Sequence, residues 1–209
     1  MPRAGLTPEA VVAEAARVAD TVGYERLTLA AIAEHFGVAL PSLYKHVNGL
    51  EAVRTGLAVR ALRELASVLA DAAAGRSRRE ALQAVAAAYR GYARAHPGSY
   101  GATLRAPDPA DAAHVQASDE VLHIVFAMLA NYELGGDDAV DATRALRAVL
   151  HGFVALEAAG GFGMPQDVDR SFQRLVDGFD ASLAQWGARV PTAATTEEPP
   201  FIGSTPPER

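Results

Sequence analysis

Residues 27–50 read LTLAAIAEHFGVALPSLYKHVNGL, and this stretch decides the fold. Its apolar residues recur at the i, i+3, i+4, i+7 spacing of one helix face; they are Leu29, Ile32, Ala33 and Phe36. Thr28 is a suitable N-cap for that helix, and Gly37 ends it. A shorter helix is predicted from about Leu40 to Val47. Two short helices joined by a tight turn form a helix-turn-helix.

The second short helix carries the polar chemistry of this stretch. Leu43 and Val47 lie four residues apart and are predicted to face inward, so Tyr44, Lys45 and His46 should face largely outward. Lys45 is the only lysine among the 19 Lys and Arg residues. Because the second helix of a helix-turn-helix enters the major groove of DNA, the pattern makes transcriptional control the leading hypothesis.

The composition predicts an all-α protein. Half of the 209 residues are hydrophobic and alanine is abundant, whereas alternating runs rich in Val, Ile and Thr are missing. No run reaches the roughly 18 apolar residues that span a membrane, and the N-terminal residues lack the apolar core of a signal peptide. Without cysteine there is neither a disulfide nor a thiolate metal site. We therefore expect a cytoplasmic protein with no membrane partner.

The charge is unusual for a protein that binds DNA. The formal net charge is −6, and residues 1–50 hold four basic side chains against five acidic ones. The basic ones are Arg3, Arg17, Arg26 and Lys45. Charge acts locally, so a small positive surface can still dock on DNA. The electrostatic, sequence-independent part of the DNA affinity is nevertheless predicted to be modest.

The helical pattern continues along the chain and suggests three regions. Thr7-Pro8-Glu9 marks the start of a first helix that ends at Gly23. Later helices are expected at about 50–74, 77–96, 112–134, 138–159 and 168–186. We predict a helix-turn-helix domain at 1–49 and a helical effector-binding and dimerisation domain at 50–187. Five of the 12 prolines fall between Pro191 and Pro207, which predicts a disordered tail at 188–209.

The helix-turn-helix stretch resembles the TetR family of bacterial repressors. The matching pieces are Gly23-Tyr24-Glu25-Arg26-Leu27-Thr28, Ile32-Ala33, Gly37-Val38 and Pro41-Ser42-Leu43-Tyr44-Lys45-His46-Val47. A second resemblance, to the family's subgroup named for a Trp-His-Gly motif, rests on His96-Pro97, His151-Gly152-Phe153 and Ala158-Ala159-Gly160-Gly161-Phe162. Leu150 stands where that motif has tryptophan, so the second match is partial.

The resemblance implies which residues meet a double-stranded DNA operator. They are Thr28, Leu40, Pro41, Ser42, Tyr44, Lys45 and His46. Thr28 and Tyr44 would contact phosphates, whereas Leu40 is suited to a thymine methyl group. Family members often carry lysine at the start of the next helix, where this chain has Leu50. Contacts to DNA phosphates would then depend more on Arg54, Arg3 or backbone amides.

The resemblance also implies a small-molecule effector and a homodimer. The expected effector-binding residues are Tyr89, Tyr92, His96, Tyr100, Leu104, Phe126, His151 and Phe153. For each of these aromatic rings and histidines, plain core packing is the alternative. In the family, the last two long helices form a four-helix bundle with their mates. The expected interface residues are Leu146, Leu150, Phe172, Leu175, Val176, Phe179 and Leu183.

The combined interpretation is a ligand-responsive transcriptional repressor that a small molecule releases from a palindromic operator. One alternative is a helical small-molecule-binding or scaffold protein with little DNA affinity, which the near-neutral N-terminal region and Leu50 would suit. An enzyme is the other class. No nucleophile–base set, metal-binding cluster or phosphate-binding loop supports it, so we predict no catalytic residue, no metal and no cofactor.

Overall fold

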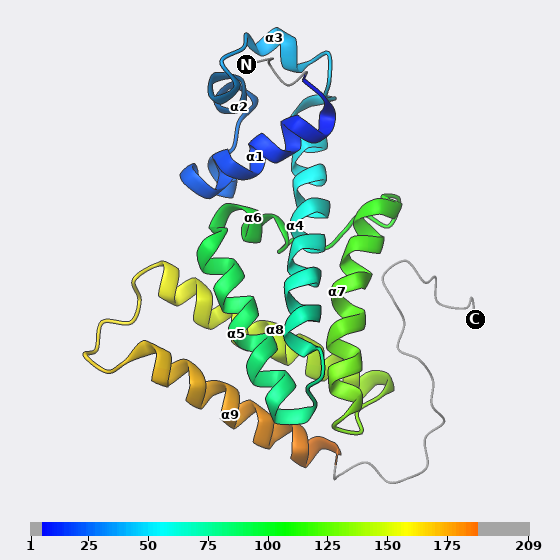
Figure 1. Ribbon diagram of the computed structural model, residues 1–209, viewed down its shortest axis with the longest axis vertical. Coiled ribbons are helices and arrows are strands. Elements are labelled where there is room, and N and C mark those ends of the chain that lie inside the picture. The colour runs from blue at the N-terminus through cyan, green and yellow to red at the C-terminus, as the bar shows by residue number, and fades with distance from the viewer. Residues whose placement is uncertain (1–5, 188–209) are drawn as a thin grey trace. The chain divides into compact units, whose positions relative to one another are not determined.

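The computed structural model describes residues 6–187, and the predicted tail at 188–209 lies outside the described residues. The described part is all-α, as the sequence predicts, and contains no strand. Its helices are shown in Figure 1. They are α1 (Pro8–Val22), a 3-10 helix η1 (Tyr24–Arg26), α2 (Leu29–Phe36), α3 (Leu40–Leu43), α4 (Gly49–Ala73), α5 (Arg78–Ala95), α6 (Pro97–Ala102), α7 (Ala112–Ala130), α8 (Gly136–Ala158) and α9 (Val168–Gly187). None of these helices is long and apolar enough to cross a membrane.

Packing divides the described chain into two compact units. Unit 1 consists of the residues up to Glu64 together with Ala95–Ser118. Unit 2 consists of Leu65–Arg94 together with the residues from Asp119 onward. The sequence places a domain boundary after residue 49, whereas packing assigns the first turns of α4 and the whole of α6 to the same unit as α1–α3. Residues far apart in the sequence therefore build unit 1.

Local capping sets the ends of α1 and α2. The Thr7 hydroxyl accepts the Ala10 N–H at 3.2 Å, and the Thr28 hydroxyl accepts the Ala31 N–H at 3.1 Å. Gly37 adopts the left-handed conformation, with φ +65°, that ends α2 at low steric cost. These details confirm the helix starts and stops that the sequence predicts.

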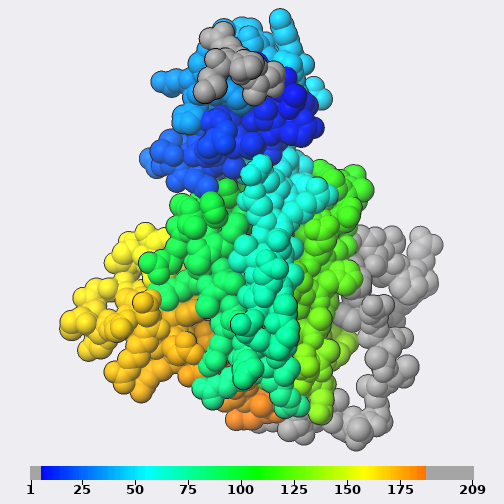
Figure 2. All heavy atoms as spheres, viewed as in Figure 1, coloured from blue at the N-terminus to red at the C-terminus, as the bar shows by residue number. Residues whose placement is uncertain are grey.

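An apolar core joins α1, η1, α2, α3, α4 and α6 within unit 1. Its fully buried side chains include Val11, Leu27, Ile32, Leu43, Val53 and Leu57. Each such burial stabilises the fold by about 1.5–3 kcal/mol relative to an exposed side chain. Figure 2 shows the atoms of α1–α3, in blue, packed closely against one another. The two short helices of the motif are therefore held in place by a well-packed apolar core.

Helix α6 meets α1 at backbone distance. A Cβ placed on Gly98 would lie 2.1 Å from the carbonyl carbon and oxygen of Ala19, so only glycine fits there. The Asp20 carboxylate accepts the Ser99 N–H at 2.7 Å, and the other Asp20 oxygen lies 3.3 Å from His96 Nδ1. One acidic side chain near the end of α1 thus caps the first turn of α6.

Two predicted helix boundaries were wrong. Helix α3 ends at Leu43 rather than near Val47, because the His46 N–H bonds the Leu43 carbonyl three residues back, at 2.8 Å, in a tighter turn. Helix α7 ends at Ala130 rather than near residue 134. Residues 131–133 each bond the carbonyl three positions back, and Glu133 takes a positive φ of 64°.

Unit 2 has its own core, in which α8 packs against α9. Its buried side chains include Leu82, Val85, Leu129, Leu134, Leu146, Leu150 and Leu183. A polar contact links the turn after α7 to α9, where the Tyr132 hydroxyl donates to Asp180 at 2.6 Å. Burial, together with the Asp180 carboxylate, raises the pKa of Tyr132, so this hydroxyl stays protonated at neutral pH.

Candidate nucleic-acid interface

The structure presents the second helix of the motif as the sequence predicts. The Leu43 side chain is fully buried and fixes α3 on the core, whereas Tyr44 is 58% exposed. Leu40, Pro41 and Lys45 are exposed on the same short segment. An aromatic hydroxyl, an ammonium group and apolar surface are therefore available side by side for a partner.

Three of the predicted DNA-binding residues are less accessible or already engaged. Ser42 and His46 are half-buried. The Thr28 side chain is exposed, but its oxygen accepts the Ala31 N–H as the cap of α2. A threonine hydroxyl that accepts a hydrogen bond still has its own hydrogen to donate. Thr28 can thus cap α2 and bond a phosphate oxygen at the same time.

A buried acid positions α2 against α1. Glu14 is 5% exposed, and its two carboxylate oxygens contact the Arg17 guanidinium and His35 Nδ1 of α2. The hydrogen bond from Arg17, supported by the His35 contact, holds the pKa of Glu14 below its ordinary value of 4.5 despite the burial. Glu14 is therefore ionised at neutral pH, and it pairs with the charge of Arg17.

Arg54 is not placed to replace the lysine that is missing at position 50. Its side chain is 21% exposed, its Cζ lies 5.5 Å from the centroid of the Tyr24 ring, and its guanidinium donates to Glu51 at 3.1 Å. Arg3, the other arginine suggested for this role, lies outside the described residues. Lys45 is the exposed cation of α3 and the turn that follows it. A single such charge is in keeping with a modest electrostatic part of the DNA affinity.

The predicted effector residues are divided between the two units. Tyr89, Tyr92 and Tyr100 are buried, and Phe126, His151 and Phe153 are half-buried. His96 and Leu104 are exposed, and both belong to unit 1, where His96 faces Asp20. The effector-binding role of all eight residues stays a prediction.

Most of the predicted dimer residues are buried inside the subunit. Leu146, Leu150, Phe172, Val176 and Leu183 are each no more than 5% exposed, whereas Leu175 and Phe179 are half-buried. A side chain that is already buried has little surface to offer a partner. The five buried residues are therefore better described as core of unit 2, and any partner must contact other residues.

Sequence reasoning missed Arg90, a buried ionised group in unit 2. It is 8% exposed and pairs with Glu157, which lies 67 residues away in the sequence. Helical periodicity marks position 90 only as part of a buried face, because a pairing partner so distant leaves no local signal. Among the described residues, no group of three or more His, Asp or Glu side chains is arranged to hold a metal ion.

Comparison with known proteins gives a consistent result along the chain. Residues 11–47 match the bacterial regulatory proteins of the tetR family, and residues 82–179 match the tetracyclin repressor-like C-terminal domain. An uncharacterised HTH-type transcriptional regulator of Bacillus subtilis, YobS, is 36% identical over 183 residues, which are 87% of this chain and 95% of that protein. Another from Mycobacterium tuberculosis, Rv0681, is 35% identical over 193 residues, 92% of this chain and 88% of that protein.

Solved structures share the fold. A protein of unknown function from Rhodococcus sp. RHA1 superposes with a TM-score of 0.71 at 26% identity, over 88% of this chain and all of that one. A TetR variant from Acinetobacter baumannii AYE, solved with minocycline, gives a TM-score of 0.66 at 22% identity, over 87% of this chain and 98% of that one. The second likeness bears on the fold alone. The curated relatives are transcriptional regulators rather than enzymes, as the sequence predicts.

Replacement of Glu14 by glutamine tests how the motif is held. We expect Glu14→Gln to lower the free energy of unfolding at pH 7 by about 1–3 kcal/mol, because charged hydrogen bonds to a buried acceptor are lost. A depressed pKa stabilises the fold above the ordinary value of 4.5 and ceases to do so as the pH falls through the folded pKa. The difference between wild type and variant should therefore shrink below pH 4.5.

Urea unfolding followed by circular dichroism at pH 7 and at pH 4 gives the two differences. Glu34→Gln, a change of an exposed carboxylate on α2, is the matched control and should have little effect at either pH. A Glu14→Gln protein as stable as wild type at pH 7 would show that the buried acid does not hold α2 in place.

Proposed function

Because this chain belongs to the TetR family of bacterial transcriptional regulators, we propose that it is a ligand-responsive repressor that binds a palindromic operator as a homodimer. The observation that carries the proposal is the exposed pair Tyr44 and Lys45, which directly follows α3 and is held in place by the fully buried Leu43. A recognition helix has to be anchored on the protein core and has to present exposed polar side chains to DNA. The DNA that it controls lies in the cytoplasm, which is where we place the protein.

Contacts to phosphates and contacts to bases have different parts in this proposal. Tyr44 and Thr28 bond phosphates and set the position of the protein on DNA. Lys45 and the half-buried His46 each reach a phosphate or a base edge. Leu40, Pro41 and Ser42 face the bases, where Leu40 and Pro41 offer apolar contact to thymine methyl groups.

The ligand response is proposed to act through α6. Gly98 contacts the α1 backbone directly, and Asp20 of α1 caps α6, so the two helices move together. An effector that favours a different position of α6 would then also favour a different position of α1. Such an effector and DNA would each weaken the binding of the other, and a tenfold loss of DNA affinity needs only about 1.4 kcal/mol.

The dimer interface is proposed to lie on the outer faces of α8 and α9. Small side chains follow one face of α8 at spacings of four and three residues; they are the exposed Ala148 and Ala155 and the half-buried Gly152. On α9, Gly178, Ala181 and Ser182 are exposed. Small residues let the helices of two subunits approach closely, and a four-helix arrangement offers the roughly 1,600 Å² that a stable interface buries.

Selection of bound genomic fragments by the purified protein tests the function. We expect enrichment of a palindromic sequence whose half-sites lie one DNA turn apart, roughly 34–36 Å, because a symmetric dimer presents two recognition helices. The double variant Tyr44→Ala/Lys45→Ala should lose the enrichment while keeping its fold. A folded wild-type dimer that enriches nothing at low salt would favour a ligand-binding protein with little DNA affinity.

The dimer proposal has a separate test. Ala155→Arg should shift the protein from dimer to monomer in sedimentation velocity, because a long charged side chain would be placed in a closely packed interface. Ala127→Arg, on the exposed face of α7, is the matched control and should leave the dimer intact. If Ala155→Arg sediments as wild type does, the interface lies elsewhere.

A further inference from the structure

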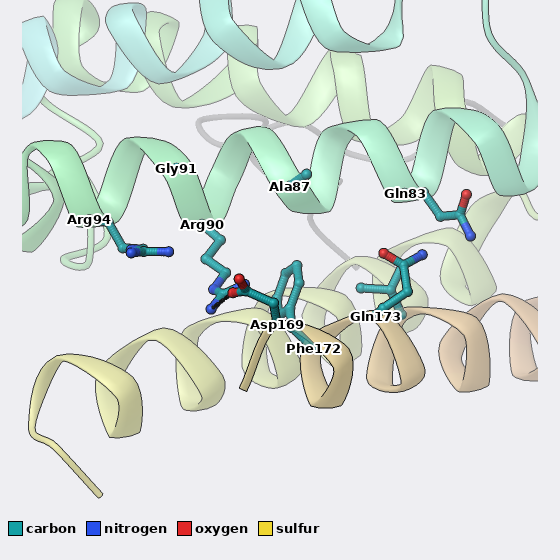
Figure 3. A pocket seen from close by; sticks show the side chains of 9 residues that line it. Gln83, Ala87, Arg90, Gly91, Arg94, Asp169, Phe172 and Gln173 are labelled. Carbon is teal, nitrogen blue, oxygen red and sulfur yellow. Dashed lines mark ion pairs between the residues drawn. The ribbon is translucent and has the colours of Figure 1, made fainter. Parts of the chain in front are cut away.

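Unit 2 contains an open cleft between α5 and α9 with a volume of about 230 Å³. Figure 3 shows its side chains, with α5 along one wall and α9 along the other. Gly91 creates part of this space, since a Cβ placed there would meet no atom within 4 Å. Phe172 and Val176 provide the apolar wall. A cavity of about 150 Å³ is enough to hold benzene, so this cleft has room for a slightly larger molecule.

One end of the cleft holds a buried cation. Arg90 is 8% exposed, and its Nε and one terminal nitrogen donate to the two oxygens of Glu157 at 2.8 and 2.5 Å. The same terminal nitrogen lies 2.7 Å from an Asp169 oxygen. The guanidinium carbon is 4.8 Å from the Phe172 ring centroid and 5.4 Å from that of Phe153. The guanidinium is thus fixed between two rings and two carboxylates.

The two carboxylates hold Arg90 unequally. The Glu157 side chain is 20% exposed and makes a two-point contact, whereas the Asp169 side chain is 76% exposed and touches through one oxygen. Arg90 holds the pKa of Glu157 below its ordinary value, which keeps that acid ionised. Exposed single-point ion pairs contribute little stability. Asp169 is therefore the carboxylate that can be exchanged for another.

The remaining lining suits a molecule with an acidic head and an apolar body. Arg94 adds a second guanidinium near the Arg90 end (Figure 3). At the opposite end, the amide groups of Gln83 and Gln173 lie across the cleft from each other (Figure 3). The Gln83 Nε2 donates one hydrogen to Asp177 at 2.8 Å and keeps a second N–H and its carbonyl oxygen for a ligand. If an outside carboxylate replaces Asp169, Arg90 keeps two negative partners, Glu157 and the ligand, and Asp169 returns to water. The exchange therefore leaves no buried charge unpaired.

We propose that this cleft binds a small organic carboxylate whose acid group replaces Asp169 at Arg90. The apolar body of the ligand lies between Gly91 and Phe172, and the glutamine amides bond a polar group at its far end. Asp169 stands in the first turn of α9, so binding releases the start of α9 from α5. Ligand binding by unit 2 does not depend on the proposed DNA recognition; only its effect on the operator rests on that function.

Calorimetric titration of the full-length protein with benzoate at pH 7, without DNA, tests the site. We expect saturable binding of benzoate, with benzamide at least about tenfold weaker because it lacks the charge that Arg90 and Arg94 bind. Equal binding of the two compounds, or no saturable binding of benzoate, would overturn the proposal. Because DNA is absent from this titration, a failure to bind benzoate would not bear on the repressor proposal. Equally, a failure of the protein to bind DNA would not change the outcome of the benzoate titration.

Variants locate the binding. Gly91→Leu should abolish benzoate binding by filling the cleft, whereas Gly91→Ala should retain it, and both replace glycine by a better helix former. Arg94→Gln should weaken binding severalfold, and the exposed Arg63→Gln on α4 is its matched control. Binding that survives Gly91→Leu unchanged would place the ligand elsewhere.

The variant Asp169→Asn distinguishes exchange of a carboxylate at Arg90 from general attraction of benzoate to a basic surface. Removal of the competing carboxylate should tighten benzoate binding severalfold, because Arg90 then lacks the partner that benzoate has to displace. Unchanged or weaker binding in Asp169→Asn would overturn the exchange. Thermal unfolding of each variant shows whether it is folded before it is titrated.

Discussion

The contact between Gly98 and the backbone of Ala19 determines how unit 1 is built. A Cβ at position 98 would lie only 2.1 Å from the Ala19 carbonyl group, so the end of α1 leaves no room for a side chain there. The backbones of α6 and α1 are therefore in direct contact. Asp20 adds hydrogen bonds to the first turn of α6. Ser99, which lies 79 residues beyond Asp20 in the sequence, thus belongs to the unit that carries the recognition helix.

The sequence predicts those features whose causes are local. The caps at Thr7 and Thr28 and the glycine stop at Gly37 all act within one helical turn, and the structure confirms them. The end of α3 escaped prediction because Leu43 and Val47 keep helical spacing although the intervening residues form tighter turns. The candidate recognition residues can be predicted from the sequence because most of them lie together in one short segment.

Features that depend on distant partners escaped prediction. The Arg90–Glu157 pair and the approach of Gly98 to α1 join segments whose spacing in the sequence carries no periodic signal. The spacing of apolar residues predicts the apolar stripe of α9, but it does not identify the surface against which the stripe packs. Phe172 and Val176 face the interior of their own subunit, which a sequence cannot distinguish from a face that meets a second subunit.

Native-state hydrogen exchange of the full-length protein, compared with that of Gly98→Ala, tests the central claim that α1 and α6 form one structural unit. If the two helices form one unit, Gly98→Ala lowers the opening free energies of α1 and α6 amides together, by about 1–3 kcal/mol. The reason is that the added methyl group forces the two backbones apart. Gly91→Ala, where a Cβ meets nothing within 4 Å, is the matched control and should leave both helices protected. Loss of protection confined to α6, with α1 unchanged, would contradict the account.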